Sequence, residues 1–279
     1  MTKSFVPTGK LSAKRREFKS IIADIRYAVF SVVRFRPDAS GKFQTTALGS
    51  GFFVGPKIFV TCWHVIDDPR NAHQNGDKYA LVNNLDGTHT IVYDITGGVG
   101  TDIHLYPDLD FAIIVCHAAN AQQAYIPIGY AHAPVGAEIG VAGYPLAIFS
   151  VDASGNADVK GLVYRIAKGV ATAVYPINLD CGDGHPLKDV PVIEVNFFFV
   201  PGNSGGPIFD AETGRAFAYV KGMQTPKINE FLDTAAPVTQ QQLPAGMSHQ
   251  YIAGIRAVYS IGLMLDRVRP ELEKFGVQL

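Results

Sequence analysis

The sequence predicts an all-β fold with one helix near each end of the chain. Short runs of apolar and β-branched residues recur, for example at 48–54, 58–61 and 111–116, and glycine, proline, asparagine and aspartate separate them. This spacing is typical of an antiparallel barrel or sandwich. With 279 residues and 47% hydrophobic content, the chain is long enough to bury a sizeable core in one large or two small domains.

The runs divide into two sets, on either side of a less regular stretch at 117–134 that we interpret as a linker. In the first set we expect strands near 27–36, 48–54, 58–61, 79–82, 90–93 and 111–116. In the second set we expect strands near 138–142, 161–175, 190–200, 207–209, 216–223 and 251–258. The pattern therefore predicts two β units, one at 28–130 and one at 131–262.

An amphipathic helix is expected at each end. From residue 10 to about 26 the apolar residues fall close to one helical face, and basic residues occupy much of the rest. We favour a helix that packs on the β unit with a solvated basic face; a helix that binds a membrane surface or nucleic acid is the alternative. We assign 1–27 to this arm and helix. The segment 263–279 is assigned to a C-terminal helix, in which Pro270 predicts a kink or a later start.

Composition argues against several classes of protein. The net charge of −1 gives no bulk attraction to nucleic acid or to an anionic membrane. No apolar run approaches the roughly 18 residues of a membrane span, and the N-terminus lacks a basic-then-apolar signal sequence. We therefore expect a cytoplasmic protein that binds neither nucleic acid nor a membrane.

The three cysteines, Cys62, Cys116 and Cys181, are odd in number and have no regular spacing. A disulfide framework would require paired cysteines, so we interpret all three as reduced thiols. Cys116 lies in an apolar run and Cys62 at the end of another, which favours core packing for both.

The segment 202–207 reads GNSGGP and lies between two apolar runs. A glycine-rich turn between strands can expose a serine hydroxyl, here that of Ser204, and aim backbone N–H groups at one point. Acyl transfer needs this combination of a nucleophile and an oxyanion site.

Two earlier segments supply the partners that such a serine requires. The segment 49–64, GSGFFVGPKIFVTCWH, reads as two short strands that end at His64, and Asp110 directly precedes the apolar run FAIIV. A serine needs a base to attack an amide, and the base needs a buried acceptor that fixes its tautomer. His64 and Asp110 suit these roles, with Asp108 as the alternative acid.

These three motifs, in the order His, Asp, Ser, resemble those of the chymotrypsin-fold serine proteases over roughly residues 28–262. The resemblance is nearest to bacterial trypsin-like peptidases, including the high-temperature-requirement type. It implies two six-stranded antiparallel β-barrels with His64 and Asp110 on the first and Ser204 on the second. Asn203 stands where digestive trypsins have aspartate, which implies no cleavage-activated zymogen. Because the sequence ends at residue 279, we expect no C-terminal peptide-binding (PDZ) domain.

The resemblance also implies further site residues. The backbone N–H groups of Gly202 and Ser204 would form the oxyanion hole. Phe198 and Phe199 would wall the specificity pocket, or alternatively fill the barrel core, and an aromatic residue at 198 argues against a trypsin-like preference for basic residues. The opposite wall would be formed by Tyr219, Val220, Lys221 and Gly222, and Lys221 could select an acidic side chain.

No cofactor or metal is expected. The other seven histidines are scattered and lack metal-ligand spacing. The segment 178–185 faintly resembles a calcium loop but fails its pattern, so a surface loop is the better interpretation.

The sequence thus predicts a serine endopeptidase that acts on protein or peptide substrates through an acyl-enzyme. Three alternatives remain: a binding protein that has kept the fold, a protease held latent until a regulatory partner orders the polar loops at 150–160 and 229–248, and an esterase.

Overall fold

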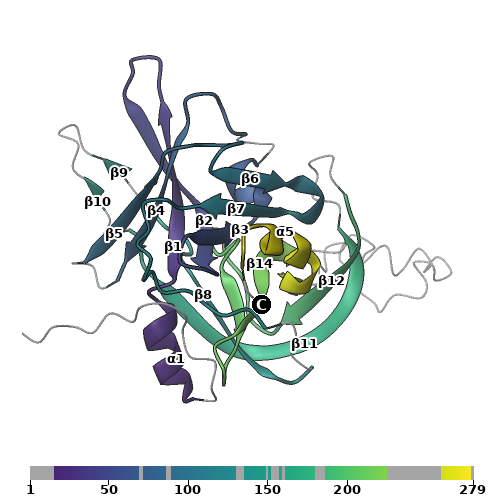
Figure 1. Cartoon of the computed structure of the whole chain (residues 1–279). Helices are drawn as coiled ribbons and strands as arrows, with labels where there is room; N and C mark the ends of the chain where they lie inside the picture. The colour runs from purple at the N-terminus through teal and green to yellow at the C-terminus, as the bar shows by residue number, and fades with distance from the viewer. Residues whose placement is uncertain are drawn as a thin grey trace, which may run out of the picture.

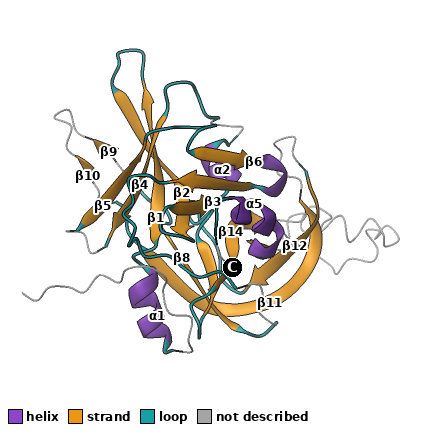
Figure 2. Ribbon diagram, in the orientation of Figure 1, coloured by secondary structure: helices purple, strands orange, loops and turns teal. Residues whose placement is uncertain are grey.

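The computed structural model describes residues 16–68, 72–85, 89–129, 135–148, 150–151, 157–158, 161–179, 186–224 and 259–277. These residues form two β units packed side by side, with short helices at the ends of the described chain (Figure 1). Strands dominate both units, as the colouring of Figure 2 shows. The all-β prediction is confirmed.

The first unit is a seven-stranded sheet with the order β5-β4-β1-β2-β3-β7-β6. Its strands are β1 (Val29–Pro37), β2 (Phe43–Phe53), β3 (Ile58–Thr61), β4 (Lys78–Asn84), β5 (Thr90–Ile95), β6 (Ile103–Tyr106) and β7 (Phe111–Val115). The expected count of six is wrong, because β6 was missed. This strand is a four-residue edge that forms a ladder with β7, and its sequence IHLY is too short to show a clear strand period.

The second unit is a closed six-stranded barrel with the order β11-β12-β15-β14-β13-β8. Its strands are β8 (Glu138–Gly143), β11 (Arg165–Leu179), β12 (Leu187–Val195), β13 (Pro207–Asp210), β14 (Ala216–Gln224) and β15 (Tyr259–Met264). The long β11 curves around the barrel (Figure 1) and pairs with both β8 and β12. The expected strand 251–258 lies outside the described residues. A two-stranded ribbon of β9 (Ser150–Val151) and β10 (Ala157–Asp158) lies beside the first unit.

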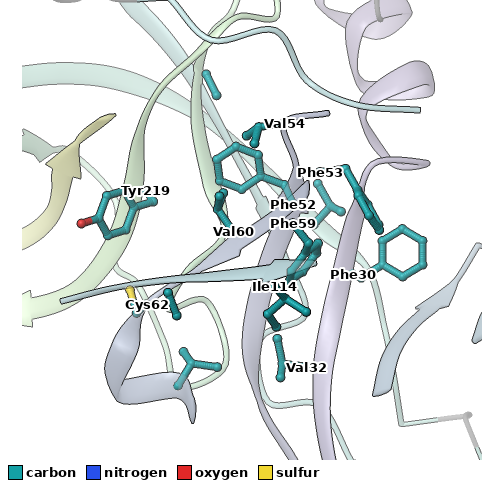
Figure 3. Close-up of a cluster of buried hydrophobic side chains, with 14 of the residues drawn as sticks. Phe30, Val32, Phe52, Phe53, Val54, Phe59, Val60, Cys62, Ile114 and Tyr219 are labelled. Atoms are coloured by element: carbon teal, nitrogen blue, oxygen red, sulfur yellow. The ribbon is translucent and has the colours of Figure 1, made fainter. Parts of the chain in front are cut away.

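The core of the first unit is rich in phenylalanine. The rings of Phe30, Phe53 and Phe59 pack edge to face, with centroids 5.2–6.4 Å apart, and all three are fully buried. Figure 3 shows this cluster, with Tyr219 of β14 well apart from Phe30. Because aromatic pairs of this kind contribute beyond their buried area, they anchor β3 firmly. The end of β3 is where the site begins.

The N-terminal helix is shorter than expected. Helix α1 spans Phe18–Ile25, and residues 10–15 lie outside the described part of the chain. Its buried face includes Ile21, and Phe18 stacks on Phe209 of β13 at 6.2 Å. The expected packing of this helix on a β unit is therefore confirmed. Among the described residues, no helix combines the length and apolar character that a bilayer span requires.

The C-terminal helix starts late, as Pro270 predicted. Residues 263 and 264 still belong to β15, a short 3₁₀ turn covers Leu265–Val268, and α5 spans Arg269–Lys274. Proline is tolerated in the first turn of a helix because its missing N–H would have no intrahelical partner there.

Polar contacts join the two units. Tyr144, just after β8, donates its hydroxyl to Asn83 Oδ1 of β4 at 2.9 Å, and Asn84 Nδ2 donates to the Leu162 carbonyl at 3.0 Å. All of these side chains are buried. Buried hydrogen bonds are directional, so they fix how the units face each other. The site lies where the end of β3 and the start of β7 meet β14 and the segment before β13.

Candidate active site

His64 and Asp110 come together because β3 and β7 are neighbours. The pairing of Thr61 with Ala112 places the residues that follow β3 beside those that precede β7. His64 lies on the one-turn helix α2 (Trp63–Ile66), directly after β3. Asp110 follows a 3₁₀ turn at Pro107–Leu109 and adopts a left-handed conformation with φ 45°. Aspartate is among the few side chains that tolerate this conformation.

The Asp110 carboxylate accepts hydrogen bonds from both the ring and the backbone of His64. His64 Nδ1 lies 2.9 Å from Oδ1 and 3.0 Å from Oδ2, and the His64 backbone N–H donates to Oδ1 at 3.1 Å. The carboxylate that faces His64 is therefore that of Asp110. Asp108, the alternative acid, instead offers its carbonyl oxygen to Arg267 at 3.0 Å.

The electrostatics keep Asp110 ionised. Its side chain is 2% exposed, and burial alone would raise the pKa of this carboxyl. The charge and hydrogen bond of His64, followed by those of Lys221, outweigh burial and lower the pKa of Asp110 from 3.8 to about 2. A carboxylate in this state can hold an imidazole in one tautomer and stabilise its cationic form.

Glycines shape the turn that carries Ser204. The Asn203 N–H donates to the Val200 carbonyl at 3.1 Å, and Gly202 has φ 96°, as expected of a type II turn with proline at its second position. A side chain at Gly202 would meet the Tyr144 carbonyl at 2.6 Å. Gly202 therefore needs both the conformational freedom and the small size of glycine.

Gly205 is constrained even more strongly. Its φ is 82°, and a Cβ atom there would collide with the Thr61 hydroxyl and the Ser50 carbonyl of the first unit. The GNSGGP motif therefore encodes a close approach of the second unit to the first, directly beside the serine.

The backbone N–H groups of Gly202 and Ser204 have no hydrogen-bond partner among the described residues. The Ser204 hydroxyl donates to the Lys221 carbonyl at 3.3 Å and, within the described chain, makes no hydrogen bond to His64. Contacts of this kind are often loose in a resting site and tighten when substrate binds.

Ser50 connects the serine turn to both units, and sequence reasoning missed it. Its Oγ donates to the Gly202 carbonyl at 2.6 Å and accepts the Tyr144 N–H at 2.8 Å. Its own N–H donates to the Ser204 carbonyl at 2.8 Å. The available signal was the pair of glycines around it: a Cβ at Gly49 would meet Val65, so β2 must pack tightly here.

Lys221 differs most from expectation. Its Nζ lies 2.7 Å from Asp110 Oδ2 and 3.4 Å from His64 Nδ1, and its side chain is 10% exposed. The ammonium is therefore engaged with Asp110 and does not project into the cleft as a selector of acidic side chains would. The expected selector role is corrected on this ground.

His64 and Ser204 line one cavity of about 440 Å³. Its other lining residues are Leu48, Asp68, Phe199, Val200, Pro201, Gly202 and Gly222. Of the expected substrate-binding residues, only Phe199 and Gly222 are among them. Tyr219 and Val220 are buried in the core, and Tyr219 donates its hydroxyl to the Leu109 carbonyl at 2.9 Å. Phe198 is 70% exposed and lines a neighbouring depression of about 200 Å³.

A cation already neutralises the acidic group of this site. Ligand atoms of Cys62, His64 and Asp110 lie within 4.8 Å of one another, a spacing that could suit a metal ion. The Lys221 ammonium lies against the Asp110 carboxylate. The positive charge that balances this carboxylate is therefore supplied by a lysine side chain, and this favours Lys221 over a metal ion as its partner. Cys62 and Cys116 are buried, as their expected core positions require, and form no disulfide among the described residues; Cys181 lies outside them.

Two solved structures show what this fold resembles. The HtrA-type protease AlgW with a decapeptide has a TM-score of 0.56 and 14% identity, over 92% of this chain and 67% of that one. The Rv3671c protease from M. tuberculosis in its active form has a TM-score of 0.56 and 16% identity, over 100% of this chain and 94% of that one. At these identities the likeness concerns the fold, and it confirms a chymotrypsin-like architecture, in which the first unit is a seven-stranded sheet and the second a closed barrel.

The sequence itself gives the stronger assignment. No curated protein matches it at a significant level. However, the profile of the trypsin-like peptidase domain matches residues 49–218, which is more than half of the chain and includes all three motif segments. The chain therefore belongs to the trypsin-like peptidase family.

Proposed function

We propose that this peptidase hydrolyses peptide bonds through a triad of Ser204, His64 and Asp110. The observation that supports this most is the position of His64, whose Nδ1 faces the buried, ionised Asp110 while the residue lines the same cavity as Ser204. With Asp110 accepting the Nδ1–H, the other ring nitrogen of His64 is left as a proton acceptor.

The reaction would proceed in two halves. Ser204 Oγ attacks the scissile carbonyl carbon, and His64 Nε2 takes the hydroxyl proton. The tetrahedral intermediate collapses when His64 gives this proton to the leaving amine, which forms the acyl-enzyme. Water then attacks the ester, again with His64 as base, and Ser204 regains its proton as the acid product leaves.

The turn around Ser204 would stabilise the oxyanion. The free N–H groups of Gly202 and Ser204 support this role, because donors held in place without a protein partner can bind developing charge without reorganisation. Ser50 supports it indirectly, since its hydroxyl holds the Gly202 carbonyl.

The cavity offers both apolar and polar groups to the residue before the cleaved bond. Leu48, Phe199, Val200 and Pro201 line it together with the polar residues His64, Asp68 and Ser204. The lining therefore does not by itself select an apolar side chain. The structure of AlgW with a decapeptide is consistent with an extended peptide as substrate. The cytoplasmic location, the domain boundaries and a regulatory partner remain predictions.

Cleavage of a mixed peptide library, read by mass spectrometry, tests the proposal. We expect cleavage by the wild type and by Ser40→Ala, which removes an exposed hydroxyl distant in sequence from the site. Ser204→Ala should cleave nothing. Equal cleavage by Ser204→Ala would contradict the proposal, and turnover of esters alone would indicate an esterase.

A second candidate is a protease that rests in a latent state. It is favoured by one observation, that the Ser204 hydroxyl bonds to the Lys221 carbonyl and not to His64. A lag before cleavage that peptide ligands abolish would support latency. Linear product formation from the moment of mixing would exclude it, and binding of peptides without any cleavage would favour a binding protein.

A further inference from the structure

The ion pair at the back of the site has an unusual composition. Asp110 Oδ2 accepts both the His64 ring nitrogen at 3.0 Å and the Lys221 ammonium at 2.7 Å. The two charged side chains of this pair are 2% and 10% exposed, so solvent screens their charges weakly. Lys221 lies on β14, and its carbonyl also accepts the Ser204 hydroxyl.

The net charge of the site follows from this arrangement. A His–Asp pair by itself has a charge of −1 at rest and becomes neutral when the imidazole takes up a proton. With Lys221 present, the cluster is neutral at rest and becomes +1. A net charge in a buried cluster is unfavourable, and like charges at short range oppose each other.

We infer that Lys221 is a positioning residue that fixes Asp110 and opposes the positive charge that His64 takes up during the reaction. The inference rests on the proposed function. Because Lys221 opposes this charge, we expect His64 to remain available as a base in more acidic solution than it would without Lys221. The chemical step near neutral pH is slower, because the cationic imidazole of the transition state is less stabilised.

Other titratable groups around His64 do not replace this effect. Those that face the cluster come from several elements: Cys62 after β3, Asp68 after α2, Asp110 before β7, and Tyr219 and Lys221 on β14. Burial raises the pKa of Tyr219 well above its ordinary range, so this phenol stays neutral. Lys221 is the cation that contacts the Asp110 carboxylate, whereas Arg267, whose charge acts on Tyr219, donates to the Asp108 carbonyl.

The test is the rate of labelling by a fluorophosphonate probe as a function of pH, in the wild type and in Lys221→Met. Methionine keeps the unbranched length and removes the charge. We expect the acid-side midpoint of the labelling rate to rise by about one pH unit in Lys221→Met. We expect the plateau rate to rise severalfold, with about tenfold as the upper end for a one-unit change. The two profiles should therefore cross.

Three further variants make the test specific. Lys221→Arg keeps a cation and should retain a midpoint near that of the wild type. Lys221→Gln, whose amide can still donate to Asp110, should raise the acid-side midpoint as Lys221→Met does. It replaces the methionine variant if that variant does not fold. Lys168→Met removes a lysine from the surface of β11, where it pairs with Glu138 at 2.8 Å. This control should leave both the midpoint and the plateau of the labelling rate unchanged.

The outcomes distinguish a failure of the role of Lys221 from a failure of the proposed function. Labelling of wild type and Lys221→Met with the same midpoint would overturn the role of Lys221 and leave the proposed function intact. A lower plateau at an unchanged midpoint would mean that Lys221 only holds Asp110 in place, which also overturns the inference. No labelling of either folded protein at any pH would overturn the proposed function, and with it the role of Lys221.

Discussion

The two halves of the active site are built by different kinds of interaction. The histidine half depends on the buried carboxylate of Asp110 and its contacts with the side chains of His64 and Lys221. The serine half, residues 200–206, depends on backbone conformation, with glycines at positive φ and carbonyls held by Ser50. Substitutions in the histidine half should therefore act mainly on rates, with a smaller and pH-dependent effect on folding stability. Substitutions in the serine half should change both.

The largest expected effect on rate lies in the histidine half. Asp110→Asn keeps the shape of the side chain but removes its charge and favours the wrong tautomer of His64. We expect turnover to fall by about 10⁴-fold, which is typical when the acid of a Ser-His-Asp triad loses its charge. Steady-state hydrolysis of a peptide cleaved by the wild type measures this. A fall of less than tenfold would show that Asp110 is not the triad acid.

Gly205→Ala tests the serine half. The added methyl group would strike the Thr61 hydroxyl and the Ser50 carbonyl in a conformation that alanine rarely adopts. We expect the free energy of unfolding to fall by about 3–5 kcal/mol, together with loss of activity. Denaturant titration measures the first quantity. Gly41→Ala, at a positive φ but with open space around it, is the matched control and should cost about 1 kcal/mol.

Ser50→Ala should produce a smaller and more selective loss. It removes the donor to the Gly202 carbonyl and leaves the Tyr144 N–H without its acceptor. We expect kcat to fall by about 10²-fold, comparable to the loss of one oxyanion donor, while KM changes little. A change confined to KM would indicate that Ser50 shapes the cavity and not the oxyanion turn.

The smallest effect concerns stability in acid. The pKa of Asp110 is lowered in the folded protein from 3.8 to about 2, so its contribution is present above pH 3.8 and is lost as the pH falls toward 2. This corresponds to roughly 2 kcal/mol. Unfolding free energies of wild type and Asp110→Asn, measured across this window, should converge as the pH falls. A constant difference would contradict the charge-based account of this half.

The same contrast explains what could be predicted from the sequence. The GNSGGP turn and the His64 strand end were visible because their residue types are local requirements: a positive φ for Gly202, and a base directly after a strand. Strand β3 was predicted with its observed bounds, since glycine and proline precede it and an apolar run defines it.

The features of the site that were missed depend on contacts distant in sequence. Ser50 reaches Gly202 across 152 residues, and Lys221 reaches Asp110 across more than 100. A lysine in an apolar strand gives no local sign of its counterion. The exposed Phe198 and the buried Tyr219 show the same limit, because alternation along a strand gives two faces but not which one borders the cleft.

The most direct measurement is the mass of the fluorophosphonate adduct and its position in the chain. The account predicts one adduct per molecule, located at Ser204 by peptide mapping. Ser204→Ala should give no adduct, Asp110→Asn should label far more slowly, and Ser40→Ala should label like the wild type. An adduct at another residue, or a folded wild type that does not react, would contradict a nucleophilic Ser204 activated by His64 and Asp110.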